Sequence, residues 1–145
     1  MLMDYGCGFN GYLSDMTRTV VVGKATPQQR EVYDLEKQML EDATKSMIPG
    51  ALATDVYKES IQAIKDTKYF PYHYSGLGHG IGLFVHEMPF MGPKSEDILV
   101  ENNVITIEPG IYIPNWGGVR IEDQILITKD GNESLTNSPR ELIEL

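Results

Sequence analysis

Residues 119–128, with the sequence VRIEDQILIT, decide the fold class of this 145-residue chain. Successive side chains of a strand point to opposite faces. One face would carry Val119, Ile121, Asp123, Ile125 and Ile127, and the other would carry Arg120, Glu122, Gln124 and Leu126. The second face brings a cation, a carboxylate and an amide into an apolar strand, and buried charges are costly unless they are paired or bind a metal. The stretch therefore predicts either a surface strand with an ordinary Arg120–Glu122 pair or a buried strand that carries a ligand.

The segments upstream of this strand predict two helices and further strands. Residues 16–22 (MTRTVVV) are mostly β-branched and indicate a strand. Residues 26–29 (TPQQ) form a capping box with proline at the first helical position, and apolar residues then recur at helical spacing over 32–47. A shorter helix is expected over 55–66, another strand over 104–107, and a turn over 129–132. This order predicts an α+β fold in which helices pack on one side of a mostly antiparallel sheet.

Composition and charge exclude several classes of function. The apolar fraction of 41% and the charged fraction of 23% are typical of globular proteins, and the net charge of −9 argues against nucleic acid as a partner. No stretch approaches the roughly 20 apolar residues that span a bilayer, and the first residues do not resemble a signal peptide. The single cysteine, Cys7, excludes an internal disulfide and is expected to pack as a small apolar residue. We therefore expect a cytoplasmic protein that binds neither membrane nor nucleic acid.

A glycine-rich segment with two histidines, residues 75–86 (SGLGHGIGLFVH), is the second unusual stretch. Glycines gather where the backbone passes close to another group. The segment lacks the GxxxxGK[ST] pattern of a phosphate loop, so nucleotide binding is a weak interpretation. A lone histidine is more often structural than a ligand, but two in one glycine-framed segment make His79 and His86 candidates for a site.

Three further carboxylates have neighbours that favour a site. Asp4 and Asp15 are separated by a glycine-rich connection, a spacing that suits a hairpin whose strands bring the two carboxylates face to face. The alternative is that both cap turns in loops. Glu108 ends the expected strand VITI and precedes Pro-Gly. Asp4 also lies near the N-terminus, where chain ends often fray unless other strands hold them.

Together these residues resemble a known family. The order Asp4, Asp15, His79, Glu108, Glu122, in the frames D-x-G, SD-x-TRT, GHGIG-x-x-VHE-x-P, IEPGIY and GVRIED, is similar to that of the pita-bread metallopeptidases. That family includes methionine aminopeptidases, aminopeptidase P and prolidases. The resemblance covers essentially the whole chain and implies the pita-bread (creatinase/aminopeptidase) fold.

The resemblance implies that these five residues bind two divalent metal ions. Asp15 and Glu122 would bridge the metals, Asp4 would bind one of them, and His79 with Glu108 would bind the other. Carboxylates with one imidazole suit Mn²⁺ or Co²⁺, with Zn²⁺ and Fe²⁺ as alternatives. The metal pair would hold a bridging hydroxide as nucleophile and polarise the scissile carbonyl.

The resemblance also implies roles beyond the ligands. Glu108 would shuttle a proton, His86 would stabilise the tetrahedral intermediate, and Thr17 would orient a ligand. The frames around His86 and Glu122 are similar to the prolidase and aminopeptidase P branch, in which the arginine that matches Arg120 lies beside the metals. The expected substrate is therefore a peptide with proline at the second position, either a dipeptide or a longer chain.

Two features depart from the family pattern. Many proline-specific relatives carry a histidine four residues before the ligand histidine, where this chain has Ser75; His73 could substitute for it or be a surface residue. The family's catalytic domain also has a substantial portion before its first aspartate ligand. We therefore expect residues 1–145 to be the C-terminal portion of such a domain, without its N-terminal half. Alone, such a portion should form a homo-oligomer or be poorly active.

Three other functions are compatible with the fold. A pita-bread domain that has lost its metals can act as a binding module, a creatinase-like enzyme cleaves other C–N bonds, and a methionine aminopeptidase-like enzyme would prefer other peptides. Retention of all five ligand positions favours a peptidase over the first two alternatives.

Overall fold

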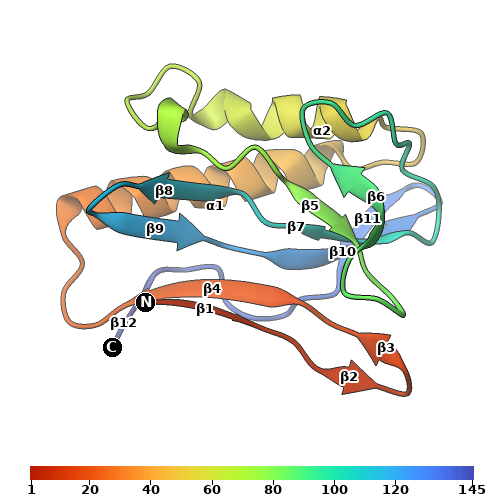
Figure 1. Ribbon diagram of the computed structural model, residues 1–145, viewed down its shortest axis with the longest axis horizontal. Helices are drawn as coiled ribbons and strands as arrows, with labels where there is room; N and C mark the ends of the chain where they lie inside the picture. Colours follow the sequence, from red (N-terminus) through yellow and green to blue (C-terminus); the bar gives the residue numbers. More distant parts are fainter.

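Two helices lie along one side of the strands in the computed structural model, which describes all 145 residues (Figure 1). The long helix α1 (Pro27–Ser46) packs against the shorter helix α2 (Ala53–Ser60), and two 3-10 turns follow, η1 (Ile61–Ala63) and η2 (Phe70–Tyr72). This arrangement confirms the expected α+β class. Neither α-helix has the length and apolar character that a membrane crossing requires.

The largest sheet is antiparallel throughout, with the strand order β11-β10-β7-β5-β6. Its strands are β5 (Gly78–Gly80), β6 (Glu87–Met91), β7 (Val104–Ile107), β10 (Asp123–Thr128) and β11 (Gly131–Ser134). A second sheet has the order β1-β4-β12, in which β12 runs parallel to β4. Its strands are β1 (Leu2–Tyr5), β4 (Met16–Val21) and β12 (Ile143–Glu144). Two short hairpins complete the fold, β2 (Gly8–Phe9) with β3 (Tyr12–Leu13), and β8 (Gly110–Ile113) with β9 (Gly117–Arg120).

The hydrophobic core lies between the helices and the large sheet. Ile105 and Ile107 of β7, with Ile125 and Ile127 of β10, are fully buried and pack with apolar residues of α1 and α2. Because side chains alternate along a strand, the residues between them point away from the helices. The second sheet, β1 and β4, lies on that side (Figure 1). The space between the two sheets is therefore where polar side chains can meet.

Helix α1 begins and ends where the sequence predicts. The Thr26 hydroxyl accepts a hydrogen bond from the Gln29 amide at 3.2 Å, while the Gln29 side chain accepts one from the Thr26 amide at 2.8 Å. This capping box satisfies two backbone donors that a helix start leaves free. The helix ends at Ser46, before Pro49-Gly50.

One residue of α1 breaks its amphipathic pattern. Glu36 is fully buried, and neither carboxylate oxygen has a hydrogen-bond partner. Burial raises the pKa of Glu36 well above its ordinary value, which the positive charge of Arg120 only partly offsets. A neutral carboxylic acid in an apolar environment is the form that costs least there.

The predicted strand over 119–128 is not continuous. Strand β9 ends at Arg120 and pairs with β8, whereas β10 begins at Asp123 and pairs with β7 and β11. Between them the Glu122 amide donates to the Thr17 carbonyl of β4 at 3.0 Å, which draws the chain toward the second sheet. Alternation would place Glu122 and Asp123 on opposite faces, but the break lets both side chains be buried.

Two other element predictions need correction. The helix expected over 55–66 starts earlier and ends at Ser60, after which the chain tightens into η1. The turn expected at 129–132 takes up only Lys129 and Asp130, because β11 already begins at Gly131. Strands β5, β6 and β11 were not predicted, since they are short and contain glycine or proline.

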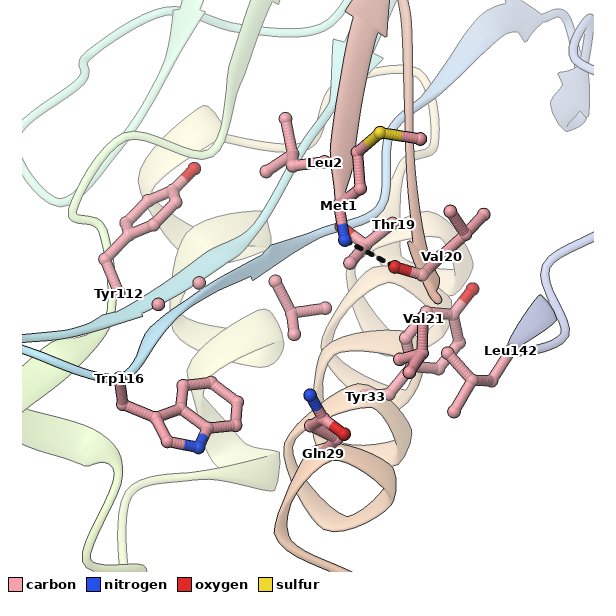
Figure 2. Close-up of a pocket in the computed structure, with 13 residues that line it drawn as sticks. Met1, Leu2, Thr19, Val20, Val21, Gln29, Tyr33, Tyr112, Trp116 and Leu142 are labelled. Atoms are coloured by element: carbon pink, nitrogen blue, oxygen red, sulfur yellow. Dashed lines mark hydrogen bonds between the residues drawn. The ribbon is translucent and has the colours of Figure 1, made fainter. Parts of the chain in front are cut away.

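An apolar cavity of about 350 Å³ lies between β1–β4, the start of α1 and the β8–β9 hairpin (Figure 2). Tyr112 and Trp116 lie on the side of the hairpin, and Tyr33 lies on α1. The ammonium group of Met1 donates to the Val20 carbonyl at 2.5 Å. The pairing of β1 with β4 holds the beginning of the chain in place, including Asp4.

Candidate metal centre

The five predicted ligands come from five different segments. Asp4 lies on β1, Asp15 directly precedes β4, His79 lies on β5, Glu108 follows β7, and Glu122 lies at the break between β9 and β10. Four of the five, Asp4, Asp15, His79 and Glu108, line one cavity.

The ligand atoms of three of these side chains meet directly. One ligand atom each of Asp15, His79 and Glu122 lie within 4.8 Å of one another. Glu108 joins them, because its Oε1 atom lies 3.2 Å from Nε2 of His79. The fifth, Asp4, is close enough for its charge to raise the pKa of both Asp15 and Glu122. The structure therefore brings the whole predicted set together.

The β1–β4 hairpin explains how two aspartates eleven residues apart reach one site. Asp4 lies opposite Thr17 in the antiparallel register, and Asp15 precedes Thr17 by two residues. The expected hairpin is thus confirmed. The alternative, two loop aspartates that each cap a turn, does not describe the structure.

Glu122 is the most perturbed carboxylate of the cluster. Its side chain is 1% exposed, and burial, with the charges of Glu108, Asp15 and Asp4, raises its pKa to about 8. Its Oε2 atom accepts a hydrogen bond from the Thr17 hydroxyl at 2.6 Å, but its buried Oε1 atom has no partner. A buried oxygen without a partner needs an explanation, and a cation bound at Oε1 would supply one.

The pKa values of Asp15 and His79 are also shifted by the neighbouring carboxylates. Burial first, and then the charges of Asp4 and Glu108, raise the pKa of Asp15. Burial lowers the pKa of His79, but its hydrogen bonds to Glu108 and to the Gly80 carbonyl outweigh burial, so the net pKa is raised. Anionic oxygens packed this closely repel one another unless protons or cations lie between them. Four carboxylates and one imidazole are a donor set that divalent metals of the Mn²⁺ to Zn²⁺ series accept.

Backbone contacts fix the orientation of His79. Its Nδ1 atom lies 3.0 Å from the Gly80 carbonyl, which can only accept, so Nδ1 carries a hydrogen and Nε2 faces the cluster, 3.2 Å from Glu108. The His79 amide donates to the Thr106 hydroxyl at 3.0 Å. A Cβ atom on Gly78 would lie 1.9 Å from the Thr106 carbonyl, so only glycine allows β5 to approach β7 this closely.

A buried arginine holds the chain around Glu122. All five N–H groups of Arg18 are used: it donates to the carbonyls of Thr17 (2.9 Å) and Glu122 (2.6 Å), to two carbonyls of residues 138–139, and to the Asp123 carboxylate at 2.6 Å. Asp123, which is fully buried, also pairs with Arg140 at 2.5 Å. This network fixes the two residues that flank the break in the strand.

Arg120 borders the centre, as predicted. It forms an ion pair with Asp4, and its Nε atom lies 3.8 Å from Glu108. It also donates to the Thr17 hydroxyl at 3.1 Å and to the Tyr112 hydroxyl at 2.7 Å. The expected roles, ion-pair partner and neighbour of the metal site, are therefore both compatible with its position.

A cavity of about 610 Å³ opens beside the ligands, and we call it the cleft. His79, Glu108 and Arg120 line it together with His86. The His86 ring is exposed, and its centroid lies 4.1 Å from that of His79. A polar group of a molecule in the cleft could therefore meet His86 and the ligands at the same time.

Two other sequence predictions are settled here. Both ring nitrogens of His73 are engaged, one 2.8 Å from the Tyr57 hydroxyl and the other 2.6 Å from the Phe70 carbonyl, so His73 has a structural role outside the cleft. The expectation that Cys7 packs as a small apolar residue is wrong. Cys7 is exposed, because the glycine-rich connection leaves it facing solvent, with its sulfur 3.3 Å from the Ser14 hydroxyl.

Several residues of the site had no role assigned from the sequence. Arg18 stands within the TRT frame, but a single arginine in a strand does not indicate that it donates five hydrogen bonds, mostly to distant parts of the chain. Tyr74, Phe90 and Tyr112 line the cleft. Tyr74 and Phe90 lie near the glycine-rich segment, and Tyr112 ends the IEPGIY frame.

Comparisons with known proteins agree with this geometry. The model of metallopeptidase family M24 matches residues 1–129. The Xaa-Pro dipeptidase of Pyrococcus furiosus is 44% identical over 143 residues, which is 99% of this chain and 41% of that protein. A dipeptidase structure from Pyrococcus horikoshii OT3 superposes with a TM-score of 0.96 at 42% identity, over 99% of this chain and 40% of the other. The X-Pro aminopeptidase structure from Thermotoga maritima MSB8 gives a TM-score of 0.95 at 33% identity, over 99% and 41%. The expected pita-bread fold is thus confirmed, and the chain spans about 41% of the length of the curated relative.

Proposed function

Since this chain belongs to metallopeptidase family M24, we propose that it forms a portion of the catalytic domain of a metal-dependent exopeptidase that hydrolyses Xaa-Pro peptide bonds. The observation that carries the proposal is the buried Oε1 atom of Glu122, which has no partner within a cluster of four carboxylates and one imidazole. The printed names of two relatives, Xaa-Pro dipeptidase and X-Pro aminopeptidase, support proline as the second residue of the substrate.

Asp4, Asp15, His79, Glu108 and Glu122 would hold two divalent ions, with Mn²⁺ or Co²⁺ as our first choice. When bound, the ions would supply an activated water nucleophile and polarise the scissile carbonyl. Asp15 and Glu122, as the two central carboxylates with raised pKa values, are the residues that need a cation most. Their carboxylates would lose protons as a metal binds.

Glu108 performs the proton transfer in this proposal. Its Oε1 atom lies 3.2 Å from His79, and its side chain lines the cleft. It accepts a proton from the attacking water as the new C–O bond forms, and it returns that proton to the proline nitrogen as the C–N bond breaks. Arg120, whose Nε atom lies 3.8 Å from the Glu108 carboxylate, helps to hold that side chain in position.

His86 contributes from the exposed side of the cleft. Its ring lies beside His79, so a donor nitrogen can reach the carbonyl oxygen of a bound peptide. The hydrogen bond strengthens as that oxygen gains negative charge in the tetrahedral intermediate, which lowers the barrier.

The experiment is a metal-dependent hydrolysis assay. The chain is stripped with EDTA, supplied with Mn²⁺ or Co²⁺, and given Xaa-Pro dipeptides, longer peptides with proline second, and Met-Ala peptides. We expect hydrolysis only with metal and mainly of the proline substrates. Glu122→Gln should abolish it, while Glu59→Gln, at an exposed position on α2, should not. Cleavage of Met-Ala peptides alone would overturn the proline assignment, and full activity of Glu122→Gln would overturn the metal assignment.

We also propose that the chain is a homo-oligomer. Strand β1 is the edge of its sheet, and unpaired edges favour association. Phe9 and Tyr12 at the β2–β3 hairpin, with Leu83 and Phe84 in the adjacent loop, are all more than 60% exposed. Light scattering after size-exclusion chromatography measures the mass, and a monomer at 100 μM protein (roughly the range where weak pairs form) would contradict the proposal.

A further inference from the structure

Three aromatic side chains line the cleft, Tyr74, Phe90 and Tyr112, and we call them together the aromatic wall. The rest of the lining is mainly charged or polar, with Asp4, Glu108 and Arg120. Phe90 lies directly opposite His79 in the β5–β6 register. An apolar ring that enters the cleft therefore meets aromatic side chains against which it can pack.

Within the aromatic wall, Tyr74 has a backbone held by a hydrogen bond and a side chain that is exposed to the cleft. Its amide donates to the Gly110 carbonyl at 2.7 Å, two residues beyond Glu108. Its ring meets that of Tyr112 edge to face, with centroids 6.4 Å apart. Its side chain is 53% exposed, and its hydroxyl makes no hydrogen bond, whereas the Tyr112 hydroxyl is occupied by Arg120.

Gly76 makes this ring position possible. A Cβ atom at residue 76 would lie 2.5 Å from a ring carbon of Tyr74 and 3.0 Å from its hydroxyl oxygen. The ring therefore lies close against Gly76, in the segment that leads to His79. Any larger residue at 76 would push the ring away from its position.

We propose that Tyr74 is a specificity-determining residue that packs against the pyrrolidine ring of the substrate's proline. This inference rests on the proposed function, in which Glu108 protonates the proline nitrogen. The proline ring must then lie within a few ångströms of Glu108, and the Tyr74 amide is bonded to the backbone two residues after Glu108. Aromatic side chains are the usual partners of proline rings in peptide recognition. The ring, rather than the hydroxyl, carries the selectivity.

The test measures selectivity in binding apart from catalysis. Gly-Pro and Gly-Ala dipeptides are titrated into the metal-free chain with EDTA, and binding is followed by NMR chemical shifts. The hydrolysis of both peptides is then measured with Mn²⁺. Tyr74→Ala and Tyr74→Leu should weaken Gly-Pro binding about 10-fold, the size of a lost aromatic contact, and change Gly-Ala binding less than twofold. Tyr74→Phe should retain the preference, and Gly76→Ala should lose it.

Tyr72→Ala is the matched control, because Tyr72 is also exposed but does not line the cleft. If the wild-type chain binds both dipeptides equally, or if Tyr74→Ala and Tyr74→Leu leave the preference intact, the inference is wrong. If the wild-type chain prefers Gly-Pro in binding but hydrolyses it with no metal, the proposed function fails while the role of Tyr74 stands.

Discussion

Replacing Glu36 by leucine should stabilise the protein, and the gain should grow as the pH rises. Glu36 is fully buried in α1, and neither of its carboxylate oxygens has a hydrogen-bond partner. Leucine has a similar size, is a better helix former than most residues, and leaves no polar atom unsatisfied.

The magnitude has two parts. Unpaired buried polar groups cost about 1–3 kcal/mol even when the acid is neutral. Burial raises the pKa of Glu36, so above about pH 5 the unfolded chain loses this proton while the folded chain keeps it. As far as Glu36 is concerned, the wild-type protein is therefore most stable at a pH below the pKa that this residue has in the unfolded chain. As the pH rises above that pKa, the free energy of unfolding falls by at most about 1.4 kcal/mol per pH unit. We expect Glu36→Leu to raise the free energy of unfolding by about 2 kcal/mol at pH 5 and by more at pH 7.

Urea unfolding of the metal-free chain at pH 5, 6, 7 and 8 measures the effect. Glu36→Gln is the informative comparison, because it removes the ionisation but keeps a polar group, so its stability should lose the pH dependence and gain less. Glu59→Leu, at an exposed position on α2, controls for added apolar character. A difference between Glu36→Leu and the wild type that stays constant from pH 5 to 8 would refute the reasoning, as would a loss of stability.

Three further predictions concern the metal centre and its support. Metal binding at pH 7 should release protons, because Glu122, whose pKa is raised to about 8, must ionise; calorimetry in two buffers of different ionisation enthalpy counts them, and zero release would contradict the ligand assignment. Arg18→Leu should lower the free energy of unfolding by about 3–5 kcal/mol, since it leaves buried Asp123 with one partner; a loss below about 1 kcal/mol in urea unfolding would be inconsistent with this. His86→Ala should lower kcat about 100-fold with unchanged metal stoichiometry, and an unaltered kcat would exclude its proposed role.

Much of the candidate metal centre was predictable, because the sequence frames around the proposed ligands together carry the resemblance to a known family. Asp4 and Asp15 are joined by glycines that suit a hairpin, and Glu108 ends a strand, so local rules place each of them. The alternation along 119–128 also predicted that Arg120 and Glu122 would serve one site. The prediction that this alternation continues through Asp123 was wrong, because the strand breaks where the Glu122 amide donates to the Thr17 carbonyl. These two residues are 105 positions apart in the sequence. No pattern within the strand contains that information.

Other features depend on tertiary contacts from the outset. The surroundings of Glu36 look like an ordinary charged position in an amphipathic helix, and only the packing of α1 reveals its burial. His73 lay close enough to the ligand histidine in sequence to be a candidate, yet Tyr57 and Phe70 engage both of its nitrogens. Strand β6 contains Pro89 and an exposed Met88, so neither alternation nor composition indicated it.

Tyr112 separates the apolar cavity from the cleft, and this arrangement lets the fluorescence of the nearby Trp116 report on the cleft. Tyr112 lines both spaces, and Trp116, which lines the cavity, is the only tryptophan of the chain. Excitation at the red edge of the absorption band, where tyrosine does not absorb, therefore observes one indole in one known location. A peptide that displaces Tyr112 would alter the polarity around that indole and shift its emission. Occupancy of the cleft could then be followed in real time, without a label and without turnover.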